Sequence, residues 1–250
     1  MIRTHFIAST SEASQKLLTL YTKQFGQTAL SDADVCVVIG GDGFLLRALH
    51  NLPNHSKVYG VNTGEVGFLL NKETPDLIKD LARPLSVEIS PLMAEIHTST
   101  SQATEWAFNE VCLTRSGSQA ADLSIKVDDK LYLKKLVADG VLIATPSGST
   151  AYNYSAGGPI LPLESNVLAL TPVCPFSPRQ WKGAILPNTS IIEIQVNKEA
   201  TRAVHATLDY QQIQNVTKII IKKDLSKTMH LLFSTENSLK ERVFKEQFLA

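Results

Sequence analysis

The sequence of 250 residues has no excess of charge of either sign, because Lys and Arg together number 24 and Asp and Glu also number 24. A protein that binds nucleic acid usually carries a surplus of basic residues, so we expect no nucleic-acid partner. No apolar run approaches the ~18 residues that span a bilayer, and the start, MIRTHFIAST, lacks the apolar core of a signal peptide. We therefore expect a cytoplasmic protein without a membrane partner.

Cysteine is scarce, with three residues far apart in the sequence: Cys36, Cys112 and Cys174. An odd, scattered set matches neither a disulfide framework nor the spacing of a zinc site. Cys36 lies within an apolar run, so we expect a small buried thiol there rather than a nucleophile.

Three common motifs are absent as well. The sequence has no Gly-x-Gly-x-x-Gly after a strand, no Walker A lysine motif and no Gly-x-Ser-x-Gly elbow. With 44% hydrophobic and 19% charged residues, the chain nevertheless has the composition of an ordinary globular protein.

The N-terminal third of the chain alternates between the patterns of strands and helices. Buried parallel strands are continuous apolar, β-branched runs, whereas helices repeat apolar residues every three or four positions. The predicted elements are a strand at 2–8, a helix from a capping box at Ser9 and Glu12 to Gly26, a strand at 35–39, a helix at 44–49 and a strand at 57–61. This alternation favours a parallel α/β domain with right-handed crossovers.

The pattern changes after Arg83 and Pro84, where short alternating or β-branched runs replace the helical spacing. The expected strands lie at 85–89, 106–113, 123–127, 141–144, 191–196 and 219–221. They predict an all-β or mostly β second domain. Near the C-terminus, Leu231, Leu232, Phe233, Val243, Phe244 and Phe248 are apolar and could pack on the first domain.

Gly40-Gly41-Asp42-Gly43 separates a buried strand from the helix that follows it. Glycines let a phosphate approach the backbone, and a helix N-terminus supplies free N–H groups. Because a carboxylate repels phosphate, Asp42 is expected to be a metal ligand, a base that orients a hydroxyl, or an acceptor for a sugar hydroxyl. The alternative is a tight turn in which Asp42 caps the helix.

A second dense cluster begins with Thr145-Pro146-Ser147-Gly148-Ser149-Thr150-Ala151-Tyr152 and continues with Ser155-Ala156-Gly157-Gly158-Pro159. Small residues allow close approach of a ligand, hydroxyls bind its polar edges, and Tyr152 offers a ring for stacking. The alternative is a polar loop between strands. Asn109-Glu110 and Asp139-Gly140 each adjoin an apolar run, where a simple strand-end turn is the alternative.

Together these motifs resemble those of the NAD kinase family. They are Gly-Gly-Asp-Gly at 40–43, Asn-Thr-Gly-Glu-Val-Gly-Phe-Leu at 62–69, Phe-Asn-Glu-Val at 108–111, Asp-Gly-Val at 139–141 and the cluster at 145–160. Lipid kinases and phosphofructokinases share a motif like the first, whereas Thr-Pro-Ser-Gly-Ser-Thr-Ala-Tyr is far more specific. The resemblance covers the chain from residue 35 to about 210.

The resemblance implies ATP-dependent phosphorylation of the 2′-hydroxyl on the adenosine ribose of NAD, which yields NADP. It implies a Rossmann-like α/β domain at 1–84 and 230–250, to which the C-terminal tail returns, and a β-sandwich-like, NAD-binding domain at 85–229. The active site would lie in the cleft between them. The implied partners are NAD and ATP, with Mg²⁺ carried largely by ATP, and further copies of the chain in a homo-dimer or homo-tetramer.

Site roles follow from the resemblance residue by residue. In the first domain, Asp42 would act as the base or orienter of the 2′-hydroxyl, and Gly43 would line the same site. Arg47 would reach a phosphate, unless it is simply a solvated helix residue, and Phe68 would close an apolar wall.

In the second domain, Asn109 and Glu110 would bind adenine and ribose groups, and Asp139 would lie near the nicotinamide. The remaining residues expected around the dinucleotide are Ser147, Thr150, Ala151, Tyr152 and Ser155.

The chain departs from the family pattern at two positions. Phe44 stands where the family usually has Thr, and Val137 stands where many members have Arg. Lys135 is the residue expected to supply the missing charge.

Two other functions remain open alternatives. A lipid or diacylglycerol kinase would need an apolar acceptor pocket or a basic membrane-facing patch, and a non-catalytic NAD sensor would lack Asp42.

Overall fold

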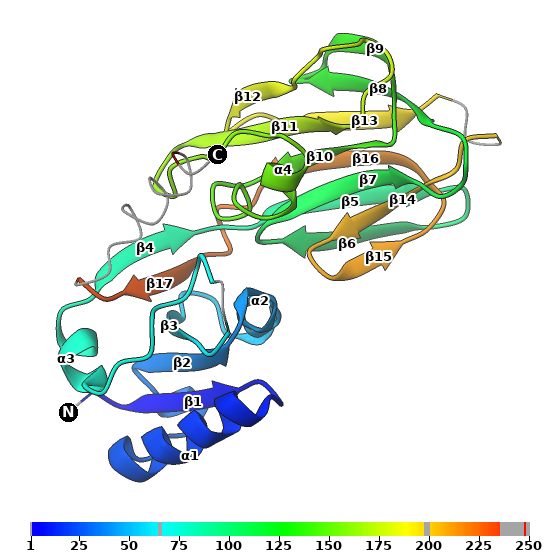
Figure 1. The fold of residues 1–250 in the computed structure, drawn as a ribbon. Coiled ribbons are helices and arrows are strands. Elements are labelled where there is room, and N and C mark those ends of the chain that lie inside the picture. Colours follow the sequence, from blue (N-terminus) through cyan, green and yellow to red (C-terminus); the bar gives the residue numbers. More distant parts are fainter. Residues whose placement is uncertain (1, 65–66, 198–200, 236–247, 249–250) are drawn as a thin grey trace. The chain divides into compact units, whose positions relative to one another are not determined.

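The computed structural model describes residues 2–64, 67–197, 201–235 and 248 (Figure 1). The chain divides into two compact units, residues 1–89 with 227–250, and residues 90–226. Among the helices in the described ranges, none is both long and apolar enough to cross a membrane.

The first unit is built on a five-stranded sheet with the order β1-β2-β3-β17-β4 (Figure 1). The strands are β1 (Thr4–Ala8), β2 (Val35–Gly40), β3 (Lys57–Asn62), β17 (Met229–Phe233) and β4 (Leu85–Ile89). The pairs β1–β2, β2–β3 and β3–β17 are parallel, and β4 is antiparallel to β17. The expected parallel α/β domain is confirmed.

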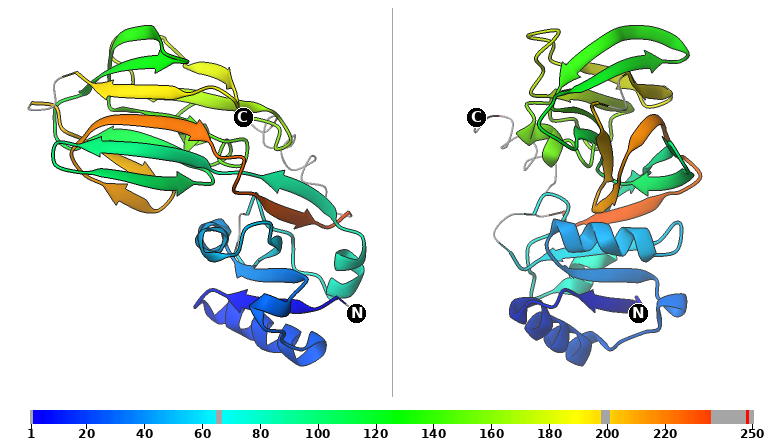
Figure 2. Two further views of the ribbon diagram at one scale, coloured as in Figure 1. Left: turned by 180° about the vertical axis from the view of Figure 1, so that it is seen from behind. Right: turned by 90° about the vertical axis from the view of Figure 1, so that its right-hand side faces the viewer.

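The helices of this unit are α1 (Glu12–Phe25), α2 (Asp42–Asn51) and α3 (Leu77–Ala82), with a short 3₁₀ turn at Leu30–Asp32. Helix α1 packs on β1 and β2, and α2 packs on β2 (Figure 2). Every residue of β2 is buried, as its continuous apolar run predicts, and the Cys36 thiol is buried with it. Burial raises the pKa of Cys36 to about 12, so this thiol stays protonated.

Helix α1 begins two residues later than its capping box predicted. The N-cap is Ser11, whose hydroxyl accepts the backbone N–H of Ser14. The Ser9 hydroxyl instead donates to the side-chain hydroxyl of Ser14. Gly26 ends the helix at φ 80°, a left-handed conformation that glycine adopts without strain. The predicted end of the helix is confirmed, and the predicted cap at Ser9 is wrong.

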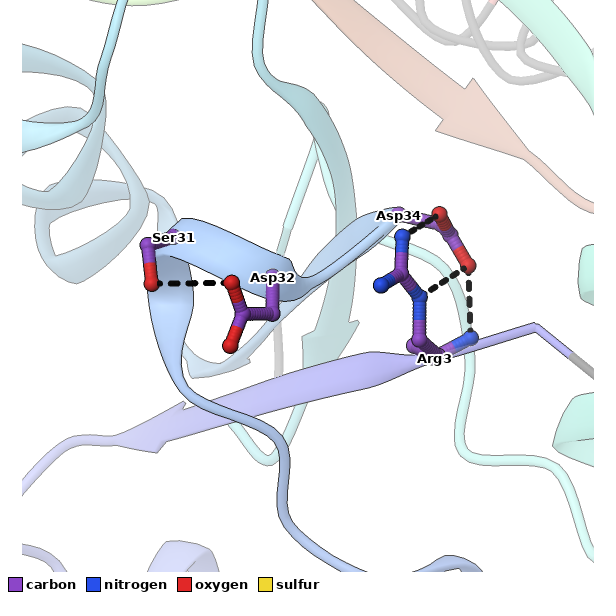
Figure 3. Close-up of polar contacts among 4 residues, drawn as sticks. All are labelled: Arg3, Ser31, Asp32 and Asp34. Carbon is purple, nitrogen blue, oxygen red and sulfur yellow. Dashed lines mark hydrogen bonds and ion pairs between the residues drawn. The ribbon is translucent and has the colours of Figure 1, made fainter.

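An exposed ion pair joins the start of β1 to the residue before β2. The guanidinium of Arg3 donates to both carboxylate oxygens of Asp34, whose Oδ2 also accepts the Arg3 backbone N–H (Figure 3). These hydrogen bonds lower the pKa of Asp34 to about 2. The pair is therefore ionised over the whole neutral range and links the start of β1 to the residue before β2.

The segment 85–89 belongs to the first sheet, although its alternating pattern suggested the second domain. Val87 of β4 lies opposite Leu231 of β17 in an antiparallel ladder. The compact unit accordingly extends to Ile89 and resumes at Lys227. The C-terminal apolar residues of β17 return to this sheet as expected, whereas Phe248 is exposed and Val243 and Phe244 lie outside the described residues.

The second unit consists of two six-stranded sheets with the orders β12-β11-β10-β7-β14-β15 and β6-β5-β16-β13-β8-β9 (Figures 1 and 2). The first sheet contains β7 (Glu110–Arg115), β10 (Gly140–Ala144), β11 (Val167–Val173), β12 (Ala184–Pro187), β14 (Val204–Leu208) and β15 (Gln211–Ile213). The second contains β5 (Leu92–Thr98), β6 (Gln102–Ala107), β8 (Ala121–Val127), β9 (Lys130–Ala138), β13 (Ile192–Val196) and β16 (Val216–Lys223).

One buried apolar cluster contains residues from both sheets, including Leu113 and Val141 from one and Ile125 and Ile219 from the other. This arrangement confirms the expected sandwich-like β domain. The run 106–113, expected as one strand, is split between β6 and β7, which lie in different sheets. The break falls at Phe108 and Asn109, the second of which is a candidate site residue.

Candidate active site

The glycine-rich segment of the first unit lies where β2 ends and α2 begins. Gly41 is the N-cap of α2, and Asp42 is its first residue. The Asp42 carboxylate accepts the backbone N–H of Phe68 at Oδ2 (2.8 Å) and that of Leu69 at Oδ1 (3.2 Å). Asp42 therefore does not cap its own helix, and its two hydrogen bonds join Phe68 and Leu69 to the start of α2.

Two further contacts lie at the end of β2. Thr63 follows β3 and donates its backbone N–H to the carbonyl of Gly40 (3.2 Å). A Cβ on Gly40 would lie 3.0 Å from Cδ1 of Phe44, so the ring of Phe44 occupies the space that a side chain at position 40 would need. Phe44, where a hydroxyl was expected from the family, thus packs against the end of β2.

The other candidates in the first unit differ in exposure. Gly43 and Arg47 are exposed on α2, and Phe68 is half-buried with its N–H bound to Asp42. The first unit therefore brings Asp42 and Phe68 into direct contact, while Arg47 projects from the helix surface.

In the second unit, the peptide groups of Phe108 and Asn109 are held from two sides. Asp209, on the turn after β14, accepts the N–H of Phe108 at 2.8 Å and that of Asn109 at 2.9 Å. The Thr145 hydroxyl donates to the carbonyl of Phe108 at 2.6 Å, and the Ser147 hydroxyl donates to the same carbonyl at 2.9 Å. The side chain of Asn109 is buried, and its Oδ1 has no hydrogen-bond partner among the described residues.

Glu110 follows directly and begins β7. Its Oε2 is buried and likewise has no partner among the described residues. Burial, together with the negative charge of Asp209, raises the pKa of Glu110 to about 8. A carboxyl group that is largely protonated at pH 7 offers a ligand both a donor and an acceptor.

The cluster at 145–159 forms a tight loop and a short helix, α4 (Tyr152–Ser155). Asn153 organises it from a buried position, because its amide donates to the carbonyls of Ser149 and Pro159 and accepts the Thr171 hydroxyl. A Cβ on Gly148 would lie 2.2 Å from the carbonyl oxygen of Asn109, so only glycine allows this contact. The loop therefore packs directly on the Asn109 peptide.

The candidates on this loop fall into two groups. Ser147 is buried, and its hydroxyl bonds to Thr145 and to the carbonyl of Phe108. Thr150 and Ala151 are half-buried and Ser155 is exposed, while 42% of the Tyr152 side chain is accessible. Ser147 is thus part of the support, and the other four residues face outward.

Asp139 lies between β9 and β10 and accepts a hydrogen bond from Nε of Arg115 on β7. The same guanidinium donates to the carbonyl of Gly117. Lys135, expected to replace a missing basic residue near Asp139, is exposed on the edge strand β9. The cation beside Asp139 is Arg115, which sequence reasoning missed because the two residues come from different strands.

Asp209 and Asn153 were also missed. A signal for Asp209 exists in the sequence, since Asp209-Tyr210 separates two short alternating runs as a hairpin turn does. Which distant peptide its carboxylate would bind has no local signature.

No group of three or more His, Cys, Asp or Glu side chains in the described ranges is arranged to hold a metal ion.

The first unit fixes an acidic side chain at a glycine-rich strand end, and the second packs a polar loop on an Asn-Glu turn. These features are those of a two-domain nucleotide-dependent phosphotransferase. Sequence models of the ATP-NAD kinase N-terminal and C-terminal domains match residues 3–89 and 108–224. The chain belongs to the NAD kinase family.

Relatives and solved structures agree with this assignment. The chain is 42% identical over 248 residues to the NAD kinase of Xylella fastidiosa (strain Temecula1), covering 98% of this chain and 96% of that protein. It is 42% identical over 251 residues to the NAD kinase of Zymomonas mobilis, covering 98% and 97%.

Among solved structures, the fold matches yeast NADH kinase complexed with NADH at a TM-score of 0.82 and 22% identity, covering 98% of this chain and 87% of that one. It matches an NAD kinase from Archaeoglobus fulgidus in complex with ATP at a TM-score of 0.76 and 21% identity, covering 98% of each chain. The protein is thus an enzyme that phosphorylates NAD with ATP, and neither a lipid kinase nor a non-catalytic sensor finds support.

Proposed function

We propose that the acceptor is the 2′-hydroxyl of the adenosine ribose and that Asp42 orients this hydroxyl for transfer. The observation that carries the proposal is the double hydrogen bond from Phe68 and Leu69 to the Asp42 carboxylate, which fixes its position. In the reaction, a bond forms between the ribose oxygen and the γ-phosphorus of ATP, while the bond from that phosphorus to the β–γ bridging oxygen breaks and ADP leaves. The hydroxyl proton passes to Asp42 or to solvent.

Positioning supplies most of the catalysis in such a reaction, because phosphoryl transfer proceeds through a loose transition state. A carboxylate that two backbone N–H groups already orient loses little conformational entropy when the substrate binds. Gly43 lines the same end of α2 without a side chain, and Arg47 is the cation on that helix available to a phosphate. Phe68 provides an apolar wall beside the bound ribose.

The second unit holds the dinucleotide in this proposal. Asn109 and Glu110 bind adenine and ribose through the buried polar atoms that lack partners among the described residues. Thr150, Ala151, Tyr152 and Ser155 surround the dinucleotide from their outward positions, and Ser147 supports the Asn109 turn. Asp139, paired with Arg115 rather than Lys135, lies near the nicotinamide.

Mg²⁺ enters with ATP as part of the substrate. Mg²⁺ prefers to keep several waters and to bind through one or two carboxylates plus substrate phosphates. Each oxygen of the Asp42 carboxylate accepts one backbone N–H group and can accept a second partner, so this side chain is the one carboxylate that we propose near the transferred phosphate.

The enzyme acts in the cytoplasm as a homo-dimer or homo-tetramer. The second unit exposes large apolar side chains, with 65% of Tyr132, 62% of Phe176 and 57% of Ile185 accessible. Tyr132 and Ile185 lie on the edge strands β9 and β12, and Phe176 lies on the connection between β11 and β12. We propose that these side chains are covered by another copy of the chain. Light scattering should return a multiple of the 27.4 kDa chain mass, and a monomer at micromolar concentration would remove this part of the proposal.

The decisive experiment incubates the protein with NAD, ATP and Mg²⁺ and measures NADP with a dehydrogenase that requires the 2′-phosphate. Product that this dehydrogenase does not accept, although ATP is consumed, would place the phosphate elsewhere. Parallel reactions with polyphosphate in place of ATP, and with NADH in place of NAD, define donor and acceptor range.

A further inference from the structure

Asp209 lies at the point where β14 separates from β7. Leu208 still pairs with Val111, and the backbone N–H of Asp209 donates to the carbonyl of Glu110 (3.3 Å). Asp209 then turns into a left-handed conformation, φ 52°, and its carboxylate reaches over the end of β7. Both oxygens are used there, Oδ2 by the N–H of Phe108 and Oδ1 by the N–H of Asn109.

The opposite side of the same segment is closed by the loop after β10. Thr145 donates its backbone N–H to the carbonyl of Asn109 at 2.9 Å, and its hydroxyl donates to the carbonyl of Phe108. Gly148 packs on the Asn109 carbonyl at a distance that excludes any side chain. The peptide groups of the turn are therefore satisfied, whereas Asn109 Oδ1 and Glu110 Oε2 are buried without a partner among the described residues.

Leaving two buried polar atoms unpaired is costly, and a fold retains such groups where a ligand pairs with them. The pairing requires that both side chains keep one orientation. The backbone of the turn sets that orientation, and Asp209 is the side chain that fixes its N–H groups.

We propose that Asp209 is a positioning residue of the dinucleotide site, which holds the Asn109–Glu110 turn so that both side chains present their free polar atoms to NAD. The proposal rests on the proposed function of Asn109 and Glu110. Asp209 touches neither substrate nor reacting atoms in this role.

The charge of Asp209 adds a second, measurable effect. Among the described residues, Asp209, Cys112 on β7 and Tyr152 on α4 interact electrostatically with Glu110. The pKa values of Cys112 and Tyr152 are raised, mainly by burial, so both groups are uncharged near neutral pH. Burial is the main cause of the raised pKa of Glu110, and the negative charge of Asp209 raises it further.

Two substitutions separate these effects. Asp209→Asn removes the charge and one of the two acceptors, and Asn tolerates the left-handed backbone. Asp209→Glu keeps the charge but moves the carboxylate by one methylene group. We expect KM for NAD to rise about tenfold in each, the effect of losing one charge-assisted hydrogen bond, while kcat stays within about threefold of the wild type.

The matched control is Asp128→Asn. Asp128 also lies in a left-handed turn, φ 50°, and its carboxylate accepts the N–H of Ile191 at 2.9 Å and the hydroxyl of Ser190. The Asp128 carboxylate binds a different segment of the same unit. Its replacement should therefore lower the melting temperature and leave KM for NAD unchanged.

The pH dependence of kcat/KM for NAD provides a readout that a merely structural role would not move. The wild-type profile should have an inflection near the Glu110 pKa of about 8. The inflection should shift to lower pH in Asp209→Asn and stay in place in Asp209→Glu.

Unchanged KM in the folded Asp209 variants, with only a lower melting temperature, overturns the proposal. If Asp209→Asn does not fold, the KM of Asp209→Glu decides alone.

Asn109→Ala separates the NAD-binding role of the turn from the positioning role of Asp209. An unchanged KM for NAD in Asn109→Ala refutes the proposed function of the turn. A raised KM in Asn109→Ala, with an unchanged KM in the Asp209 variants, refutes only the role of Asp209.

Discussion

Replacing Asp42 by Asn tests the catalytic assignment directly. The substitution keeps the shape of the side chain, but an amide has one acceptor oxygen where the carboxylate uses two, for Phe68 and Leu69. One N–H therefore faces an amide NH₂ group, which costs about 1–3 kcal/mol of folding stability. For a chain of this size the melting temperature should fall by several degrees.

The effect on turnover should be much larger than the effect on stability. If Asp42 orients or accepts the proton of the 2′-hydroxyl, its neutral replacement should lower kcat by about 10²–10⁴-fold, the usual contribution of a general base. KM for NAD should stay close to the wild-type value, because the adenine and ribose contacts are proposed on Asn109 and Glu110.

The control variant is Asp76→Ala, which removes a carboxylate from the start of α3 in the same unit. Asp76 accepts the backbone N–H of Lys79 at 3.1 Å as an ordinary N-cap, and its loss costs about 1 kcal/mol. Turnover should be unchanged in this variant. Near-normal kcat in folded Asp42→Asn would refute the catalytic role, and an equal loss of kcat in Asp76→Ala would attribute the effect to stability.

Three further predictions concern the second unit. Tyr152→Ala should weaken NAD binding by about 1–3 kcal/mol in calorimetry, the scale of base–aromatic stacking, and unchanged affinity would contradict a stacking role. Gly148→Ala should destabilise the protein by about 1–3 kcal/mol and raise KM for NAD, because its Cβ meets the Asn109 carbonyl at 2.2 Å. Gly117→Ala, whose Cβ meets nothing within 4 Å, should do neither. The Glu110 pKa is raised from 4.5 to about 8, so the folded state holds a proton that the unfolded state releases. The free energy of unfolding of the wild type should therefore decrease as the pH rises from about 4.5 to about 8. In denaturant titrations Glu110→Gln should flatten that decline, and an identical slope in both proteins would contradict the raised pKa.

Local chemistry in the sequence was sufficient to predict much of the first unit. The buried strand at 35–39, the glycine break after it and the helix end at Gly26 depend on residues within one or two turns of each other. The cap at Ser9 was misplaced because serines stand at positions 9 and 11 and both lie near Ser14, so the spacing alone favoured the wrong one.

Strand pairing over long distances could not be predicted in the same way. The alternating run at 85–89 has the same appearance in either domain, and only its ladder with β17 assigns it to the first sheet. Apolar residues at every second position show that one face of a strand is buried, but they do not show which sheet the strand joins.

The candidate site shows the same division between sequence and structure. The residue types and their order were sufficient to nominate the segments that we propose carry the chemistry, since glycines, hydroxyls and carboxylates gather at several predicted strand ends. Tertiary structure alone decided that Asp42 binds the turn at Phe68, that Arg115 rather than Lys135 neutralises Asp139, and that Asp209 brackets Asn109. Each of these contacts joins residues far apart in the chain, and a hydrogen bond between such residues has no periodicity or composition that a sequence can display. Its partners are fixed only when packing brings the donor and acceptor atoms to about 3 Å, the length of one hydrogen bond.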